Sequence, residues 1–162
     1  MIDLELDAEY YAYINMPEAR AAYRLALTWA PGFYKLKLGP QGTVIQRVVR
    51  FFSKHSDRTH PFAFIVNRGD LRWYCRGPSR WHPAMTLENL RQFFPDIFEK
   101  YNSKGKSPEL VIVVRTAEDM EKVIRHVLIA YLEPQLAHAA NVLMLRQLPV
   151  PKTLSGELRE QP

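Results

Sequence analysis

The amino-acid sequence predicts an α+β fold, with a small mixed or antiparallel sheet that contains a β-hairpin and is packed by about four helices. One observation is that strand-like and helix-like segments alternate irregularly, without the repeated strand–helix–strand order of a parallel sheet. Another is that two short aromatic runs, 62–66 and 71–75, flank the turn sequence "NRGD", a pattern typical of a hairpin. We expect a single globular domain over 1–148 and a flexible C-terminal tail over 149–162.

The first forty residues alternate between strand and helix patterns. Apolar and acidic residues alternate over 2–7, which predicts a strand. The segment 15–32 has helical spacing, with Asn15 as a possible cap and a Pro-Gly stop. The run "FYKLKL" at 33–38 predicts a strand whose lysine row could lie beside the acidic row of the first strand.

The middle of the chain is less regular. Apolar residues at helical spacing over 43–55 predict a helix capped by Thr43, although the β-branched content leaves a strand open. The proline-bearing segment 76–85 is expected to be an irregular arm. A helix is predicted from Thr86 to Tyr101, bent or restarted at Pro95.

The last third of the chain begins with its most hydrophobic strand candidate, 109–115, which is expected to be central in the sheet. Thr116 and Asp119 have the spacing of a capping box that opens a helix to about Leu132. A further helix is expected over 135–148. Its small and apolar residues are interpreted as core, with a homodimer interface as the alternative.

Several classes of function are disfavoured by composition. No apolar run is long enough to cross a bilayer, and the acidic start is unlike a signal peptide, so we expect a cytoplasmic protein that does not contact membranes. There is no phosphate-binding glycine loop and no histidine or cysteine spacing typical of a metal site, so no cofactor and no metal are expected. Cys75 and His82 could form a nucleophile and base, but Cys75 lies on the inward face of its predicted strand. The sequence favours a non-catalytic role.

Positive charge is concentrated in one window. Between Gln46 and Arg80 there are eight lysines and arginines against Asp57 and Asp70, an excess of six in a chain whose whole net charge is +5. A local excess of this kind indicates an acidic partner more strongly than the total does.

Within that window, the stretch "RGDLRWYCRGPSRWHP" at 68–83 interleaves arginines with aromatic rings. If 71–76 is a strand, Leu71, Trp73 and Cys75 face the core. Residues 72, 74 and 76 then form an exposed Arg-Tyr-Arg row. Guanidinium groups bind phosphates and aromatic faces stack on bases, so this row is suited to a nucleic acid.

The sequence therefore predicts a nucleic-acid-binding module, for DNA or RNA, that has no catalytic activity of its own. The predicted contact residues are Arg68, Arg72, Tyr74, Arg76, Arg80, Trp81 and His82. The residues predicted to supply long-range attraction are Arg47, Arg50, Lys54 and Arg58. The alternative is a protein–protein interaction module, such as an adaptor, inhibitor or immunity-type protein, whose arginine and aromatic patch binds an acidic protein.

Overall fold

The computed structural model describes residues 1–40, 46–56, 58–101 and 108–133. Its centre is a six-stranded antiparallel sheet with the strand order β1-β2-β3-β4-β6-β5. The strands are β1 (Tyr34–Leu38), β2 (Val48–Ser53), β3 (Phe62–Val66), β4 (Leu71–Cys75), β5 (Phe98–Lys100) and β6 (Glu109–Val114). The α+β class and the antiparallel sheet with its hairpin are thus confirmed.

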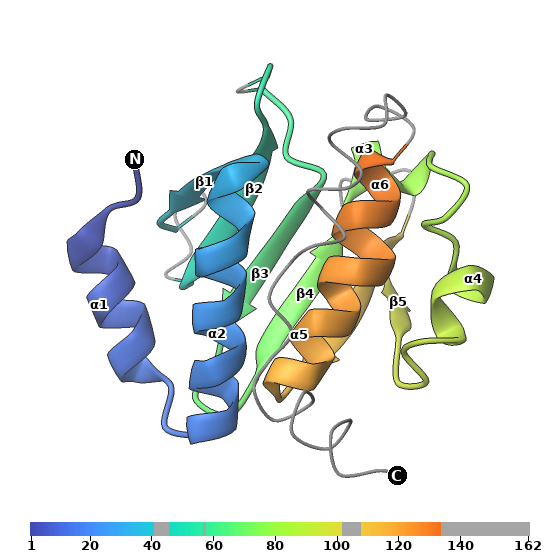
Figure 1. Cartoon of the computed structure of the whole chain (residues 1–162). Coiled ribbons are helices and arrows are strands. Elements are labelled where there is room, and N and C mark those ends of the chain that lie inside the picture. The colour runs from blue at the N-terminus through green and yellow to red at the C-terminus, as the bar shows by residue number, and fades with distance from the viewer. Residues whose placement is uncertain (41–45, 57, 102–107, 134–162) are drawn as a thin grey trace, which may run out of the picture.

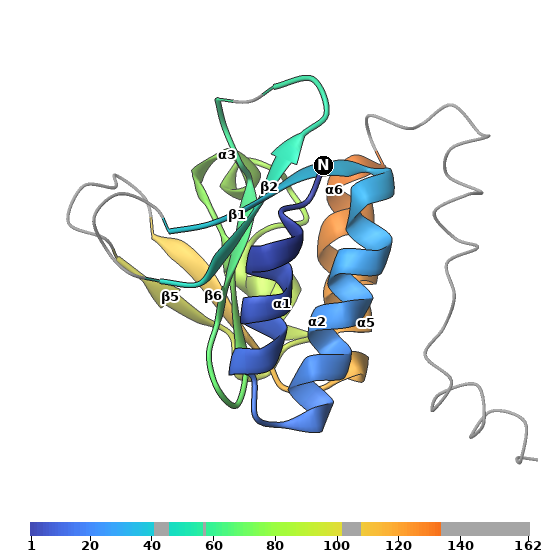
Figure 2. The same ribbon diagram turned by 90° about the vertical axis from the view of Figure 1, so that its left-hand side faces the viewer.

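Helices form a layer on one face of the sheet, as Figure 1 and Figure 2 show. The layer contains α1, α2 and the rod that begins with α5, while the short α3 and α4 lie in the connection between β4 and β5. The helices are α1 (Leu4–Tyr13), α2 (Pro17–Trp29), η1 (Ala30–Gly32), α3 (Gly77–Arg80), α4 (Leu87–Arg91), α5 (Ala117–Val123), the π-helical η2 (Ile124–Ile129) and α6 (Ala130–Leu132). None of the helices in the described ranges has both the length and the apolar character needed to span a bilayer.

The hydrophobic core lies between the sheet and this helix layer. Trp73 is fully buried at its centre, and its ring lies 4.9 Å from that of Phe51, 5.8 Å from that of Phe62 and 6.0 Å from that of Phe64. Because side chains alternate along a strand, burying this row turns the intervening residues of β2, β3 and β4 to the opposite face.

The first residues do not form the strand that their alternation predicts, because they belong to α1. The Asp3 carboxylate accepts hydrogen bonds from the backbone N–H groups of Glu5 and Leu6, which caps the helix. Tyr10 and Ile14, four residues apart, are buried on its inner face. The proposed pairing of acidic and lysine strands is therefore wrong as well.

The predictions for 43–55 and for 86–101 also need correction. Val48–Ser53 is strand β2, with buried side chains on both of its faces. The strand preference of its β-branched residues therefore outweighs the helical spacing of its apolar residues. After Thr86 the helix lasts only to Arg91, and Phe98–Lys100 is strand β5. Pro95 falls between them, where it cannot continue a helix.

Other elements agree with the sequence. The helix at 15–32 is confirmed as α2 and η1, although its cap residue is Met16 and not Asn15. The hairpin β3–β4 is confirmed, with Phe62 opposite Cys75. Strand β6 is interior, between β4 and β5.

Two further points concern the connections. The capping box at Thr116 is present and opens the rod to Leu132. The segment 76–85 contains the short helix α3, so it is more regular than an arm. Thr43, the helix predicted at 135–148 and the tail at 149–162 lie outside the described residues.

Candidate nucleic-acid interface

The face of the sheet opposite the helices is basic. Residues paired across antiparallel strands share a face, and Lys37 pairs with Arg50, Arg50 with Ala63, and Ala63 with Tyr74. Side chains two residues along each strand lie on the same face. We call the following set the cationic face: Lys35, Lys37, Arg50, Arg72, Tyr74, Arg76 and Lys100. In the part of the chain that the structure describes, no helix covers it (Figure 2).

Aromatic rings lie beneath the cations of this face. The Lys37 ammonium is 4.9 Å from the centre of the Phe52 ring, and the Lys100 ammonium is 5.6 Å from that of Tyr74. Contacts of this kind hold a lysine stem along the ring and keep its charged end in water. The lysines of the face are exposed, whereas Tyr74 is half-buried.

A hollow of about 230 Å³ opens in the cationic face. Val48, Ala63 and Ile65 contribute apolar side chains to it. The remaining lining residues are polar or aromatic: Gln46, Tyr74, Arg76, Lys100 and Glu109. An apolar floor with cations at the rim can hold a flat ring and an attached anionic group together.

Arg76, which lines this hollow, and Arg50 both lie close enough to His60 for their charges to act on its imidazole. Burial, together with the positive charges of Arg76 and Arg50, lowers the pKa of His60 from 6.5 to about 4. The His60 ring also packs 5.1 Å from that of Phe52. His60 Nε2 and Arg50 Nε are buried without a hydrogen-bond partner among the described residues.

Carboxylates offset part of this charge. Arg72 lies 3.3 Å from Asp70, and Arg76 lies 3.4 Å from Glu109. Arg50 makes no ion pair within the described ranges. The cationic face therefore keeps an excess of positive charge, and Arg50 contributes to it directly.

Arg47 and Arg68 lie apart from the cationic face. Both stack on Tyr13 at the end of α1, at 3.6 Å and 4.8 Å from the ring centre, and Arg47 is also 3.7 Å from Glu9. Arg47 thereby attaches α1 to the start of β2, and Arg68 attaches it to the hairpin turn, where the Asn15 N–H also donates to the Arg68 carbonyl. Their positions suit a structural role.

The three predicted residues after β4 are also separated. Arg80 is turned inward, with its side chain only 15% exposed, and it donates to the Met85 carbonyl and lies 3.7 Å from Glu99. His82 accepts a hydrogen bond from the Ala84 N–H and packs against Tyr131. Trp81 follows α3 and is 85% exposed, so its ring is available to a partner.

The remaining predicted residues are peripheral. Lys54 lies just beyond β2 and lines a second hollow at the edge of the sheet. Arg58 is exposed in the connection to β3. Of the eleven residues predicted from the sequence, the structure thus brings together Arg50, Arg72, Tyr74 and Arg76 on one face.

Sequence reasoning missed Lys35, Lys37 and Lys100. A signal for the first two was present, because their alternation with Leu36 in "FYKLKL" assigns both to one face of a strand. These lysines share a face of the sheet with Arg50 only because 48–53 is a strand that pairs with β1, and the helical spacing of 43–55 did not predict that strand. Lys100 carried no such signal, since 98–100 followed a helical pattern.

Other chemistry is not indicated. Cys75 is fully buried, as its alternation predicts, and burial raises the pKa of its thiol to about 12, which disfavours the reactive thiolate. No cluster of three or more potential metal ligands occurs among the residues described.

The fold and site together define a small α+β domain with one helix-covered and one basic sheet face. Comparison with protein-family models, with curated proteins and with solved structures gives no significant match. The site is therefore interpreted from its own geometry.

Proposed function

We propose that this protein is a non-catalytic nucleic-acid-binding module that acts in the cytoplasm and binds through its cationic face. The observation that carries the proposal is the basic row of Arg50, Arg72 and Arg76 on the sheet face where Tyr74 and Arg76 line a hollow. Phosphates meet guanidinium donors there, and a base has a ring to stack on.

A single strand fits this face better than a duplex. Tyr74 and Phe98 lie in one cross-strand row with Val111 between them, and Phe98 is 40% exposed. Strands in a sheet are about 4.8 Å apart, so the two rings are separated by roughly 10 Å along the row. Unpaired bases of an extended strand can stack on both rings while the phosphates follow the lysines and arginines.

The test is the binding of fluorescein-labelled oligonucleotides, single-stranded and duplex, as DNA and as RNA. Anisotropy titrations at about 50 mM and about 200 mM NaCl measure the salt dependence, which is expected to be about 0.7 in log–log slope for each phosphate bound on a single strand. We expect single strands to bind more tightly than duplexes. Affinity that does not change with salt contradicts the proposal.

Matched charge reversals locate the interface. Arg50→Glu, on the cationic face, is expected to weaken binding by more than about tenfold, because it removes one phosphate contact and introduces repulsion. Arg91→Glu makes the same change on the exposed side of α4, outside the cationic face, and is expected to have little effect. Equal losses for the two variants would mean that only total charge matters.

The exposure of Trp81 favours a second candidate function, the binding of an acidic protein. An exposed tryptophan is typical of protein interfaces. Trp81→Ala separates the two functions. If it abolishes capture of a partner protein but leaves oligonucleotide binding unchanged, the tryptophan belongs to a protein-binding site.

A further inference from the structure

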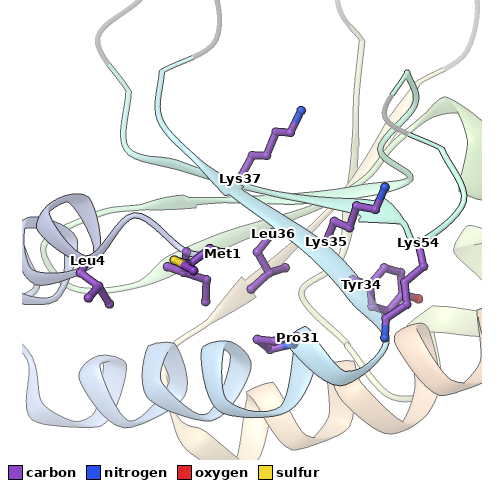
Figure 3. Close-up of a pocket in the computed structure, with 9 residues that line it drawn as sticks. Met1, Leu4, Pro31, Tyr34, Lys35, Leu36, Lys37 and Lys54 are labelled. Atoms are coloured by element: carbon purple, nitrogen blue, oxygen red, sulfur yellow. The ribbon is translucent and has the colours of Figure 1, made fainter.

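A second hollow, of about 650 Å³, lies along the outer edge of β1 (Figure 3). Leu36 projects from β1 toward Pro31 in η1, and Leu4 at the start of α1 and Met1, which precedes that helix, flank it. Lys35 and Lys37 project from the opposite side of the strand. The lining residues are Met1, Ile2, Leu4, Pro31, Tyr34, Lys35, Leu36, Lys37 and Lys54.

Among the residues that the structure describes, the backbone of β1 is paired on one side only, since β1 is the first strand of the sheet and its partner is β2. The Gly39 N–H donates to the Val48 carbonyl, which makes these two residues a hydrogen-bonded pair. Such pairs alternate along an antiparallel ladder, so Lys37 and Lys35 direct their backbone groups to β2. Leu36 therefore directs its N–H and C=O away from the sheet, as an open template for another strand.

The two sides of this edge have different chemistry. Leu36 is 8% exposed, whereas Leu4 is 77% exposed and Met1 is fully exposed. The hollow therefore joins the buried core to apolar side chains that are open to solvent. On the other side are the exposed lysines at 35 and 37, with Lys54 nearby. A strand added to β1 would place alternate side chains in the apolar hollow and beside the lysines.

We propose that the β1 edge binds an extended segment of a partner protein in which acidic residues alternate with apolar ones. Backbone hydrogen bonds to Leu36 supply the pairing, the hollow accepts the apolar side chains, and the lysines select the acidic ones. A second copy of this chain is a poor occupant. Antiparallel pairing of two β1 strands about Leu36 would bring Lys35 of each copy opposite Lys37 of the other, and like charges in that position repel.

The probe is a fluorescein-labelled octapeptide in which glutamate alternates with valine, titrated with the full chain. A peptide in which lysine alternates with valine serves as the control, and it is expected not to bind because its charges repel the lysines. Two N-methylated versions test the backbone mode. Methylation of the amides that face β1 should abolish binding, and methylation of the alternate set should preserve it.

Substitutions in the hollow test its apolar side. Leu4→Asp is expected to weaken binding of the glutamate–valine peptide by more than about tenfold, because it replaces apolar surface with a repelling carboxylate. Leu4→Met keeps the apolar side chain and should retain binding. An acidic residue in the first turn of a helix is favourable, so Leu4→Asp should fold, which circular dichroism checks.

The charge beside the hollow is tested by Lys37→Glu, with Lys122→Glu at an exposed position of α5 as the matched control. Only the first should weaken peptide binding. The proposal is overturned if both N-methylated peptides bind like the parent, if Leu4→Asp has no effect, or if dodecanoate saturates the hollow while the peptide does not bind. Leu4→Asp should leave oligonucleotide binding unchanged, so the two proposals can fail separately.

Discussion

The arginines of the cationic face differ in what their guanidinium groups meet. Arg76 lies 3.4 Å from Glu109, and both side chains line the hollow beside Tyr74. The carboxylate therefore lowers the positive potential at the place where a phosphate is proposed to bind. It holds Arg76 in position at the same time.

Removing that carboxylate charge is expected to strengthen nucleic-acid binding. Glu109→Gln should tighten the binding of a single-stranded oligonucleotide by roughly 2- to 5-fold, which corresponds to about 0.5–1 kcal/mol for one partly exposed ion pair. Glu118→Gln changes an exposed glutamate at the start of α5 and is the control. Fluorescence anisotropy measures both, and a weaker Glu109→Gln complex would mean that the ion pair mainly orients Arg76.

His60 makes folding stability depend on pH. Its pKa is about 4 in the folded protein, below the ordinary value of 6.5, because burial and the charges of Arg76 and Arg50 disfavour the imidazolium. Between these two pH values the unfolded chain binds more protons than the folded protein. The contribution of His60 is therefore complete above about pH 6.5 and is lost as the pH falls toward 4.

We therefore expect His60→Gln to lose less stability than the parent between about pH 7 and pH 4.5. Urea unfolding at both pH values measures the difference. His126 also has a lowered pKa, from burial first and then from Arg125 and Lys122, so His126→Gln reports its separate share. Parallel pH curves for His60→Gln and the parent would contradict the assignment.

At the scale of elements, a local sequence pattern predicted the secondary structure correctly only where it fitted a helix or a strand but not both. The residues of α1 alternate apolar and acidic, yet the same residues also place Leu6, Tyr10 and Ile14 at a spacing of four. Asp3 resolves the ambiguity because its carboxylate caps a helix. In β2 the reverse holds, since both faces of the strand are buried and the apolar pattern loses its period of two.

The capping box shows how much one element depends on its first residue. The Thr116 hydroxyl accepts from the Asp119 N–H, and Asp119 accepts in return from the N–H groups of Arg115 and Thr116. Thr116→Ala should lower the free energy of unfolding by about 1 kcal/mol. Thermal unfolding checks this, and Thr116→Ser, which keeps the hydroxyl, should remain close to the parent.

The whole molecule is organised by the difference between the two faces of its sheet. The helix-covered face holds the ring cluster around Trp73, and the other face holds the cations. The hairpin made Arg72, Tyr74 and Arg76 predictable as one row, because strand alternation is a local property. The positions of Arg47, Arg68 and Arg80 were not predictable, since they depend on Tyr13 and Glu99, which are distant in sequence.

Removing the centre of the core should strongly destabilise the protein. Trp73→Ala leaves a cavity that Phe51, Phe62 and Phe64 cannot fill, and it is expected to cost about 3–5 kcal/mol. That is a large share of the 5–15 kcal/mol that usually separates folded from unfolded domains. Denaturant unfolding measures the loss. Trp81→Ala, which removes an exposed ring, should leave stability nearly unchanged.

The strand order has a consequence for synthesis of the chain. Strands β2, β3 and β4 each pair with the strand that precedes them, so this meander can assemble as it leaves the ribosome. Strand β5 is different, because its partner β6 is translated after it and inserts between β4 and β5. Until β6 is inserted, one edge of β4 in the nascent polypeptide has no hydrogen-bonding partner. The ribosome-bound intermediate is therefore most vulnerable to chaperone capture or misassociation at that stage.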